Sequence, residues 1–145
     1  MHLKSRGQAM VEFAIVAPLF FLLLFAIIEF GWYVYQVQTL NDAVREATRY
    51  AIVHGSTSLC PSGPLPGGAA NGCDPSGTKV EAVVRNYAVG LSSAGLSFPT
   101  MTWSPDDGRG SVFVLVAQAN FQPLIPWVPL PTITIQGGSS DVIQH

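Results

Sequence analysis

The sequence predicts a membrane-anchored α+β protein. A long N-terminal transmembrane helix is expected to continue into a small domain with one further helix and a three-stranded antiparallel sheet. Three observations favour this fold. Residues 13–28 contain no charge and no hydrogen-bonding side chain. An apolar stripe with helical period follows over residues 37–51. The last third of the chain has strand-like segments separated by turn residues.

The overall composition agrees with one small domain on an apolar anchor. The chain has 145 residues, which suffices for about one domain. Only 11% of them are charged, whereas soluble domains average about 25%. The formal net charge of −2, and the lack of a basic patch with interleaved aromatic residues, argue against a nucleic-acid partner.

The transmembrane helix is predicted over residues 8–35. As a helix, residues 13–28 would span about 24 Å, slightly less than the ~30 Å hydrocarbon core of a bilayer. Extension to Met10 and Tyr35 makes the segment long enough. Aromatic residues at its far end suit the membrane–water interface (Trp32, Tyr33 and Tyr35).

Basic residues ahead of the helix predict its orientation. Lys4 and Arg6 precede the span, with no acidic residue before Glu12, and positive charge stays on the cytoplasmic side of a membrane. The N-terminus is therefore expected in the cytoplasm, and the residues after Tyr35 outside it. A cleaved signal peptide is the alternative. Against it, the apolar run is long for a signal peptide, and no small-x-small site follows it.

Glu12 is the residue of the span that most needs an explanation. A carboxylate at mid-bilayer costs about 2.5–3.5 kcal/mol on insertion scales, and less near the interface. Glu12 can therefore simply mark the end of the apolar span. The other interpretation considers Glu12 together with its neighbours, because a short basic leader and Gly7 stand ahead of it and Phe13 opens the apolar run.

This N-terminal sequence resembles type IV pilin-like precursors, and specifically the TadE-like minor pilins (pseudopilins) of the tight-adherence (Flp) pilus system. The resemblance covers about the first fifty residues. It is carried by the stretch 6–14 and by four residues after it (Pro18, Glu29, Phe30 and Gly31). It implies a pilin-like fold and a prepilin peptidase that removes the basic leader, residues 1–7. The cut falls between Gly7 and Gln8, so Glu12 stands five residues beyond it.

The resemblance also implies a role in assembly. In the family, the glutamate at this position is thought to neutralise the N-terminal amine of a neighbouring subunit, and an unpaired buried charge is strongly penalised. Glu12, Phe13 and Pro18 are therefore expected at a contact between subunits. The expected partners are the prepilin peptidase, other pilin-like subunits, the inner-membrane pilus assembly platform and the lipid bilayer.

The predicted function is structural. The protein would be a processed subunit needed to assemble a tight-adherence pilus for surface attachment or secretion, located in the cytoplasmic membrane or incorporated in the pilus. The alternative is an uncleaved single-pass anchor whose extracytoplasmic domain binds a cell-envelope partner. We find no catalytic triad, P-loop or dinucleotide motif, so neither an enzyme nor a cofactor is predicted.

Three further residues of the span carry two interpretations each. Pro18 removes one backbone donor, which predicts either a harmless kink or a local softening of the helix. Glu29 stands 17 residues after Glu12, about 25 Å along the helix, beside Trp32. Glu29 and Trp32 therefore suit a solvated outer interface, or a contact with a basic group of a partner.

The helix is predicted to continue outside the membrane over residues 36–54. Its apolar residues recur at steps of three and four (Val37, Leu40, Val44, Ala47 and Ala51). On the other side, Arg45 and Arg49 can each meet an acidic residue three positions earlier (Asp42 and Glu46). Gly55 is the expected end of the helix.

Residues 55–77 form a predicted loop rich in Gly, Pro and Ser. Outside the cytoplasm, a disulfide between Cys60 and Cys73 is the default expectation and would contribute about 3 kcal/mol. Zinc is the alternative, but it needs about four ligands and only His54 stands near the two cysteines. No metal site is predicted.

Residues 78–145 are expected to complete the domain. Thr78 and Glu81 form a capping-box pattern at the start of a helix that ends near Gly90. Strands are predicted over 97–104, 111–122 and 132–136, with a hairpin turn over 105–108. One face of the middle strand is apolar (Phe113, Leu115, Ala117, Ala119 and Phe121).

The segment 121–131 contains four prolines among large apolar residues, so it cannot be a central strand. One interpretation is a cover over the end of the small core. The other is an exposed apolar loop around Trp127 that contacts a partner or the membrane.

Overall fold

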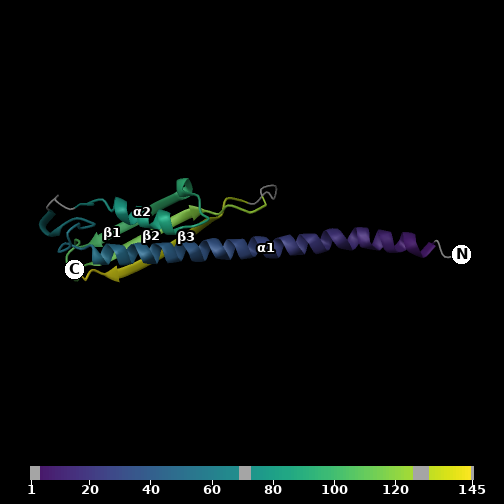
Figure 1. The fold of residues 1–145 in the computed structure, drawn as a ribbon, viewed down its shortest axis with the longest axis horizontal. Helices are drawn as coiled ribbons and strands as arrows, with labels where there is room; N and C mark the ends of the chain where they lie inside the picture. The colour runs from purple at the N-terminus through teal and green to yellow at the C-terminus, as the bar shows by residue number, and fades with distance from the viewer. Residues whose placement is uncertain (1–3, 69–72, 126–130, 145) are drawn as a thin grey trace.

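The predicted α+β architecture is confirmed. The computed structural model describes residues 4–68, 73–125 and 131–144. A long helix α1 (Lys4–Val53) is followed by a second helix α2 (Thr78–Tyr87). Three strands come next, β1 (Leu96–Ser104), β2 (Val112–Asn120) and β3 (Thr134–Val142). The strands form one antiparallel sheet in the order β1-β2-β3. The sheet and α2 lie along the C-terminal half of α1, and the N-terminal half of α1 projects alone (Figure 1).

The C-terminal half of α1 forms one wall of the core. Its apolar stripe is buried as predicted, with Val37 partly covered and four residues fully enclosed (Leu40, Val44, Ala47 and Ala51). This stripe packs against α2, β2 and β3. Burying a Val or Leu side chain contributes about 1.5–3 kcal/mol. The domain and the C-terminal half of the helix therefore stabilise each other.

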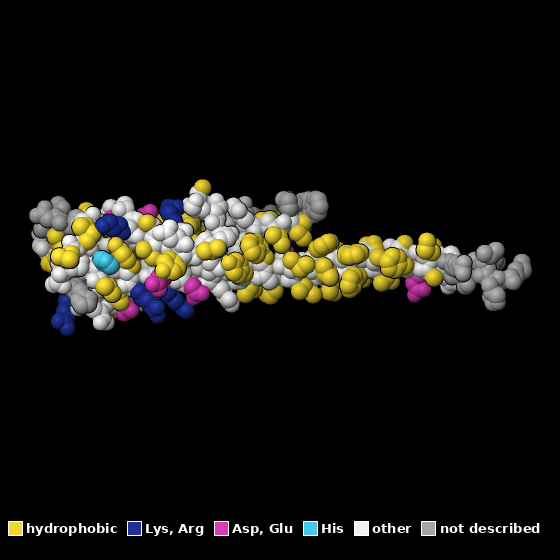
Figure 2. Space-filling model, viewed as in Figure 1, with side chains coloured by type: hydrophobic (Ala, Val, Ile, Leu, Met, Phe, Trp, Pro, Cys, Tyr) yellow, Lys and Arg dark blue, Asp and Glu magenta, His cyan; other side chains and the backbone are white. Residues whose placement is uncertain are grey.

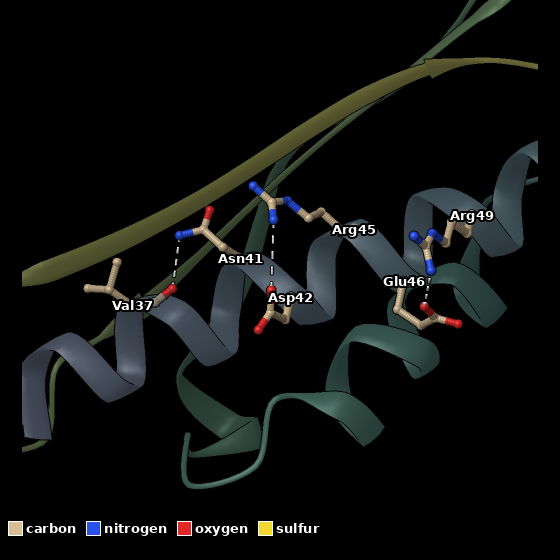
Figure 3. A network of polar contacts seen from close by, with 6 residues as sticks. All are labelled: Val37, Asn41, Asp42, Arg45, Glu46 and Arg49. Atoms are coloured by element: carbon tan, nitrogen blue, oxygen red, sulfur yellow. Dashed lines mark hydrogen bonds and ion pairs between the residues drawn. The ribbon is translucent and has the colours of Figure 1, made fainter.

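The opposite face of this half of α1 is polar and open to solvent. Asp42 and Arg45 lie 3.9 Å apart, and Glu46 and Arg49 lie 3.6 Å apart, which confirms the two predicted pairs (Figure 3). The amide of Asn41 donates to the carbonyl of Val37 at 2.9 Å (Figure 3). The arginines are about three-quarters exposed, so each pair contributes only a few tenths of a kcal/mol. These contacts indicate a solvated surface.

The middle strand β2 supplies the other wall of the core. Its alternate residues Phe113, Leu115 and Ala117 are fully buried, in agreement with the predicted face. The sheet approaches α1 closely at Gly137 of β3. A Cβ at this position would lie 3.2 Å from Cγ of Leu40 and 3.3 Å from the Leu40 carbonyl oxygen. A glycine therefore allows β3 to lie directly on the helix.

The prediction for the third strand was wrong in extent. We expected a short strand over 132–136, whereas β3 continues through two glycines and two serines to Val142. It pairs with β2 along its whole length, from Asn120↔Thr134 to Val112↔Val142. The extension is therefore due to the hydrogen-bond ladder with β2, which needs no apolar side chains in the added part.

The predicted capping box at the start of α2 was also wrong. The residue before the helix is Gly77, which makes no side-chain cap. Instead, the buried carboxylate of Asp74 accepts hydrogen bonds from the Thr78 amide, the Thr78 hydroxyl and the Lys79 amide, each at 2.7 Å. Asp74 thus satisfies free amides of the first turn from outside the helix.

In the described parts of the loop 55–77, which has no periodicity, two glycines lie against Trp103 of β1. Gly63 and Gly77 both have positive φ angles, and a Cβ on either would come within 2.7 Å of the Trp103 ring. The ring also packs on Phe113, with ring centroids 4.9 Å apart. Glycine at these two positions therefore permits both the backbone conformation and the close approach to the indole.

Candidate functional site

The N-terminal half of α1 exposes an almost entirely apolar surface. Figure 2 shows hydrophobic side chains along most of the visible face of the projecting helix, with an acidic side chain near its far end. In the described part of the chain, one helix, Gly7–Val53, is long and apolar enough to cross a membrane. Exposed apolar patches this large are rare on soluble proteins and mark interaction or membrane surfaces. A single membrane span is therefore consistent with the structure.

The residues predicted for processing and assembly lie on this exposed segment. Gly7, Gln8 and Glu12 are exposed and helical, and a Cβ on Gly7 would meet nothing within 4 Å. Phe13 is 70% exposed. Pro18 lies inside α1, which continues through it as one helix. Each of these side chains is accessible to a second molecule, and Pro18 also lines the groove described below.

Glu29 and Trp32 instead contact the domain of their own chain. They bind residues 121–125, which we call the strap, just after β2. The backbone amide of Leu124 donates a hydrogen bond to Oε1 of Glu29 at 3.0 Å. The indole Nε1 of Trp32 donates to the carbonyl of Gln122, also at 3.0 Å. The two residues predicted at the outer interface thus hold the strap against α1.

Gln36 completes this contact and was missed by the sequence analysis. Its side chain is fully buried. Its Nε2 donates to the Gln122 carbonyl at 3.0 Å, and its Oε1 accepts from the Gln122 amide at 3.5 Å. Two features of the sequence could have indicated this contact. Positions 29, 32 and 36 share one face of a helix, and Gln36 places an amide side chain within an apolar stretch. The middle strand was predicted to reach Gln122, but β2 ends at Asn120, since these side chains bind the Gln122 backbone.

The strap and α1 enclose an apolar groove. It has a volume of about 690 Å³ and runs along α1 from Pro18 to Tyr33, with Phe121, Ile125 and Ile133 on the other side. The strap and residues 131–133 extend along α1 beyond the end of the sheet (Figure 1). At the domain end of the groove, Tyr33 and Phe121 pack edge to face, with ring centroids 5.5 Å apart. Glu29 is the charged residue in the lining.

The segment 121–131 therefore has two parts. Phe121 is buried and closes the end of the core, as the first interpretation predicted, whereas Leu124 is 55% exposed. Trp127, the centre of the second interpretation, lies outside the described residues.

The cysteines of the predicted disulfide are free thiols in this structure. A hydrogen bond with the Cys73 thiol lowers the pKa of Cys60, and the Lys79 ammonium, whose Nζ lies 2.9 Å from Cys60 Sγ, lowers it further. The same contact with Cys60 raises the pKa of Cys73. The two thiols are thus neighbours, and the disulfide stays a prediction.

These features define an α+β protein with one candidate membrane helix whose outer half is packed into a small domain. The family model of TadE-like proteins matches residues 7–49. Over these residues, which make up most of α1, the chain is similar to TadE-like proteins, and this confirms the predicted resemblance. Comparisons with curated proteins and with solved structures found no match.

Proposed function

We propose that this protein is a pilin-like assembly subunit of a tight-adherence (Flp-type) pilus. A prepilin peptidase cuts it between Gly7 and Gln8, and the mature chain then joins or primes the pilus through its N-terminal helix. Its role is structural rather than catalytic. The observation that carries the proposal is the TadE-like match over residues 7–49, which contains both Gly7 and Glu12.

The geometry of α1 supports processing and assembly. The helix leaves the domain near Glu29, and the described residues before it project beyond the sheet (Figure 1), some of them lining the groove. Removal of residues 1–7 would therefore leave the fold intact. It would also remove Lys4 and Arg6, so the formal charge changes from −2 to −4 before the new amine is counted. The exposed apolar helix would remain available for packing beside other subunits in the membrane.

Glu12 supports the proposal through its accessibility. Its side chain is exposed, and it makes no ion pair with the side chains that the structure describes. In a low-dielectric membrane or fibre, a carboxylate is stabilised only when it is partnered. The new amine of a neighbouring mature subunit is the partner proposed here.

Cleavage is tested by the intact mass of the protein from cells with and without an active prepilin peptidase. A chain that starts at Gln8 only when the peptidase is active would support the proposal. Gly7→Ala should block the cut, whereas Gly31→Ala is the matched control, since both glycines lie in α1 with free space at Cβ. Full-length protein in both strains would leave an uncleaved anchor, whose envelope partner crosslinking would have to identify.

Assembly is tested separately with Glu12→Ala. This variant should be cleaved normally but should lose pilus formation at the cell surface. Normal assembly by Glu12→Ala would contradict the pairing of Glu12 with the neighbouring amine, even if cleavage after Gly7 is confirmed.

A further inference from the structure

The groove between α1 and the strap has no assigned occupant. We propose that it binds one phospholipid of the extracytoplasmic membrane leaflet. An acyl chain lies along Phe21 and Phe25, and an amine-bearing headgroup lies against Glu29. This inference rests on the proposed function for the placement of α1 in the membrane, and it adds a specific lipid partner.

The first argument is the depth of the groove. Pro18 and Glu29 both line it and are eleven positions apart, which corresponds to about 16 Å along a helix. Half of a ~30 Å hydrocarbon core is about 15 Å. The groove therefore extends through one leaflet when Glu29 lies at the outer interface. This is the depth that an acyl chain occupies beside a membrane helix.

The second argument is the chemistry of the lining. Apart from Glu29 and the phenol of Tyr33, all the lining side chains are apolar, and the strap contributes Phe121 and Ile125. The volume of about 690 Å³ is within the usual range for small-molecule sites, roughly 300–1,000 Å³. At this depth the surroundings offer hydrocarbon rather than water. Lipid acyl chains can therefore fill the groove without leaving a void.

The third argument is the Glu29 carboxylate. Its Oε1 accepts a hydrogen bond from the Leu124 amide. Its Oε2 is buried, and within the described residues it has no hydrogen-bond partner. An unpaired buried carboxylate oxygen is costly, and an ammonium group would form a strong, charge-assisted hydrogen bond with it. Charge complementarity therefore favours an amine headgroup, such as that of phosphatidylethanolamine, over an anionic one.

The main competing occupant is α1 of a second copy. Residues 13–28 of such a helix carry no hydrogen-bonding side chain, so this stretch could fill the groove but could not donate to Oε2 of Glu29. A lipid provides both the apolar chain and the donor in one molecule. The two occupants predict different products of photo-crosslinking.

The test uses the full chain with benzoylphenylalanine, a photo-crosslinking amino acid, in place of Phe25 in the groove. Ile27 is the control position, since it is 63% exposed at nearly the same depth but does not line the groove. The proteins are reconstituted in vesicles of phosphatidylethanolamine and phosphatidylglycerol in equal amounts, and adducts are identified by intact mass. A second label at Phe21 tests the same groove if the Phe25 variant does not fold.

At Phe25, adducts with phosphatidylethanolamine should exceed those with phosphatidylglycerol by about tenfold, the ratio expected from one charge-assisted hydrogen bond. At Ile27 the ratio of the two adducts should equal the ratio of the two lipids in the vesicle. Glu29→Gln keeps an acceptor for the Leu124 amide but removes the charge, so it should abolish the preference at Phe25.

Other results would overturn the proposal. Equal amounts of the phosphatidylethanolamine and phosphatidylglycerol adducts at Phe25 would mean that only bulk lipid enters the groove. A crosslink from Phe25 to a second copy would mean that a helix of that copy occupies the groove. In both cases lipid adducts at Ile27 would leave the membrane anchor, and with it the proposed function, intact. If neither position gave lipid adducts, both the groove proposal and the membrane placement would be wrong.

Discussion

The backbone amide of Leu124 donates a hydrogen bond to the carboxylate of Glu29, 3.0 Å away and 95 positions earlier in the chain. This bond joins α1, the candidate membrane helix, to the strap. Because the bonds from Trp32 and Gln36 to Gln122 lie on the same helix face, the strap and this part of α1 form one unit. The position of the domain along α1 is therefore coupled to the sequence of the helix.

Removing the Glu29 carboxylate should loosen the strap. Glu29→Ala deletes a charge-assisted hydrogen bond worth about 1.5–3 kcal/mol, so the Leu124 amide should exchange with deuterium at least about tenfold faster. Glu29→Gln retains an acceptor and should exchange more slowly than Glu29→Ala. Hydrogen-exchange mass spectrometry of the full chain in detergent checks this. Equal exchange in all three proteins would mean that Glu29 does not hold the strap.

Two adjacent glycines of β3 should respond differently to the same substitution. Gly137→Ala places a Cβ 3.2 Å from Leu40 Cγ and 3.3 Å from the Leu40 carbonyl, so it should destabilise the domain by about 1–3 kcal/mol. In Gly138→Ala the nearest atom is Cγ2 of Val116 at 3.8 Å, so the change should stay within about 0.5 kcal/mol. Urea unfolding of both variants measures the difference. Similar losses would show that α1 and β3 are not in close contact at Gly137.

The cap on α2 provides a third prediction. Asp74→Ala removes the acceptor for three donors on Thr78 and Lys79, and loss of a helix cap costs about 1–2 kcal/mol. Glu81→Gln is the control, because it affects only a half-exposed ion pair with Arg85 at 3.8 Å and should cost about 0.5 kcal/mol or less. Free energies of unfolding from urea titration compare the two. If Asp74→Ala cost no more than Glu81→Gln, Asp74 would not be the cap of α2.

Asp107 should make stability depend on pH. Its side chain is fully buried, and its carboxylate oxygens have no partner among the described residues. Burial raises the pKa of Asp107, and neighbouring Asp106 raises it further. The folded state therefore holds the proton more tightly than the unfolded chain. This stabilises the fold at low pH, and the benefit is lost as pH rises above the usual pKa of about 3.9 toward the raised value.

Asp107→Asn should consequently stabilise the protein by roughly 1 kcal/mol at neutral pH and change little below pH 3. Asp106→Asn is the control, since the Asp106 carboxylate accepts bonds from the Gly108 amide at 2.8 Å and the Ser111 hydroxyl at 3.0 Å. Asp106→Asn should therefore not increase the stability of the protein at neutral pH by a comparable amount. Melting temperatures across the pH range provide the measurement. If Asp107→Asn and the unsubstituted protein followed the same pH profile, Asp107 would carry no burial penalty.

The two thiols should differ in reactivity. The thiolate is the nucleophile, and the pKa of Cys60 is lowered by Cys73 and by Lys79. Iodoacetamide at neutral pH should therefore modify Cys60 several-fold faster than Cys73, and Lys79→Met should slow the reaction of Cys60. Peptide mass mapping over time follows both sites. Equal rates would contradict this contact, and mild oxidation that removes two hydrogens would establish the predicted disulfide.

The sequence by itself determined the elements whose cause is local. The uncharged stretch 13–28 predicts a membrane helix because of its length and composition, and the stripe from Leu40 to Ala51 predicts a helix face because apolar residues recur with helical period. The buried face of β2 follows from alternation in the same way. The TadE-like segment was recognised by its resemblance to a known family, and that resemblance is carried by residues close together in the sequence, such as Gly7 and Glu12.

Only the tertiary structure decided which distant backbone groups meet. The strap on Glu29, the Asp74 cap, the extension of β3 to Val142 and the glycines against Trp103 all depend on main-chain amides, carbonyls or close approaches. Every residue has a main-chain carbonyl and every residue except proline has an amide donor, so no pattern of side chains marks where they pair. Packing the sheet on α1 places Gln122 and Leu124 beside Trp32 and Glu29. The groove therefore exists only once the whole chain has folded.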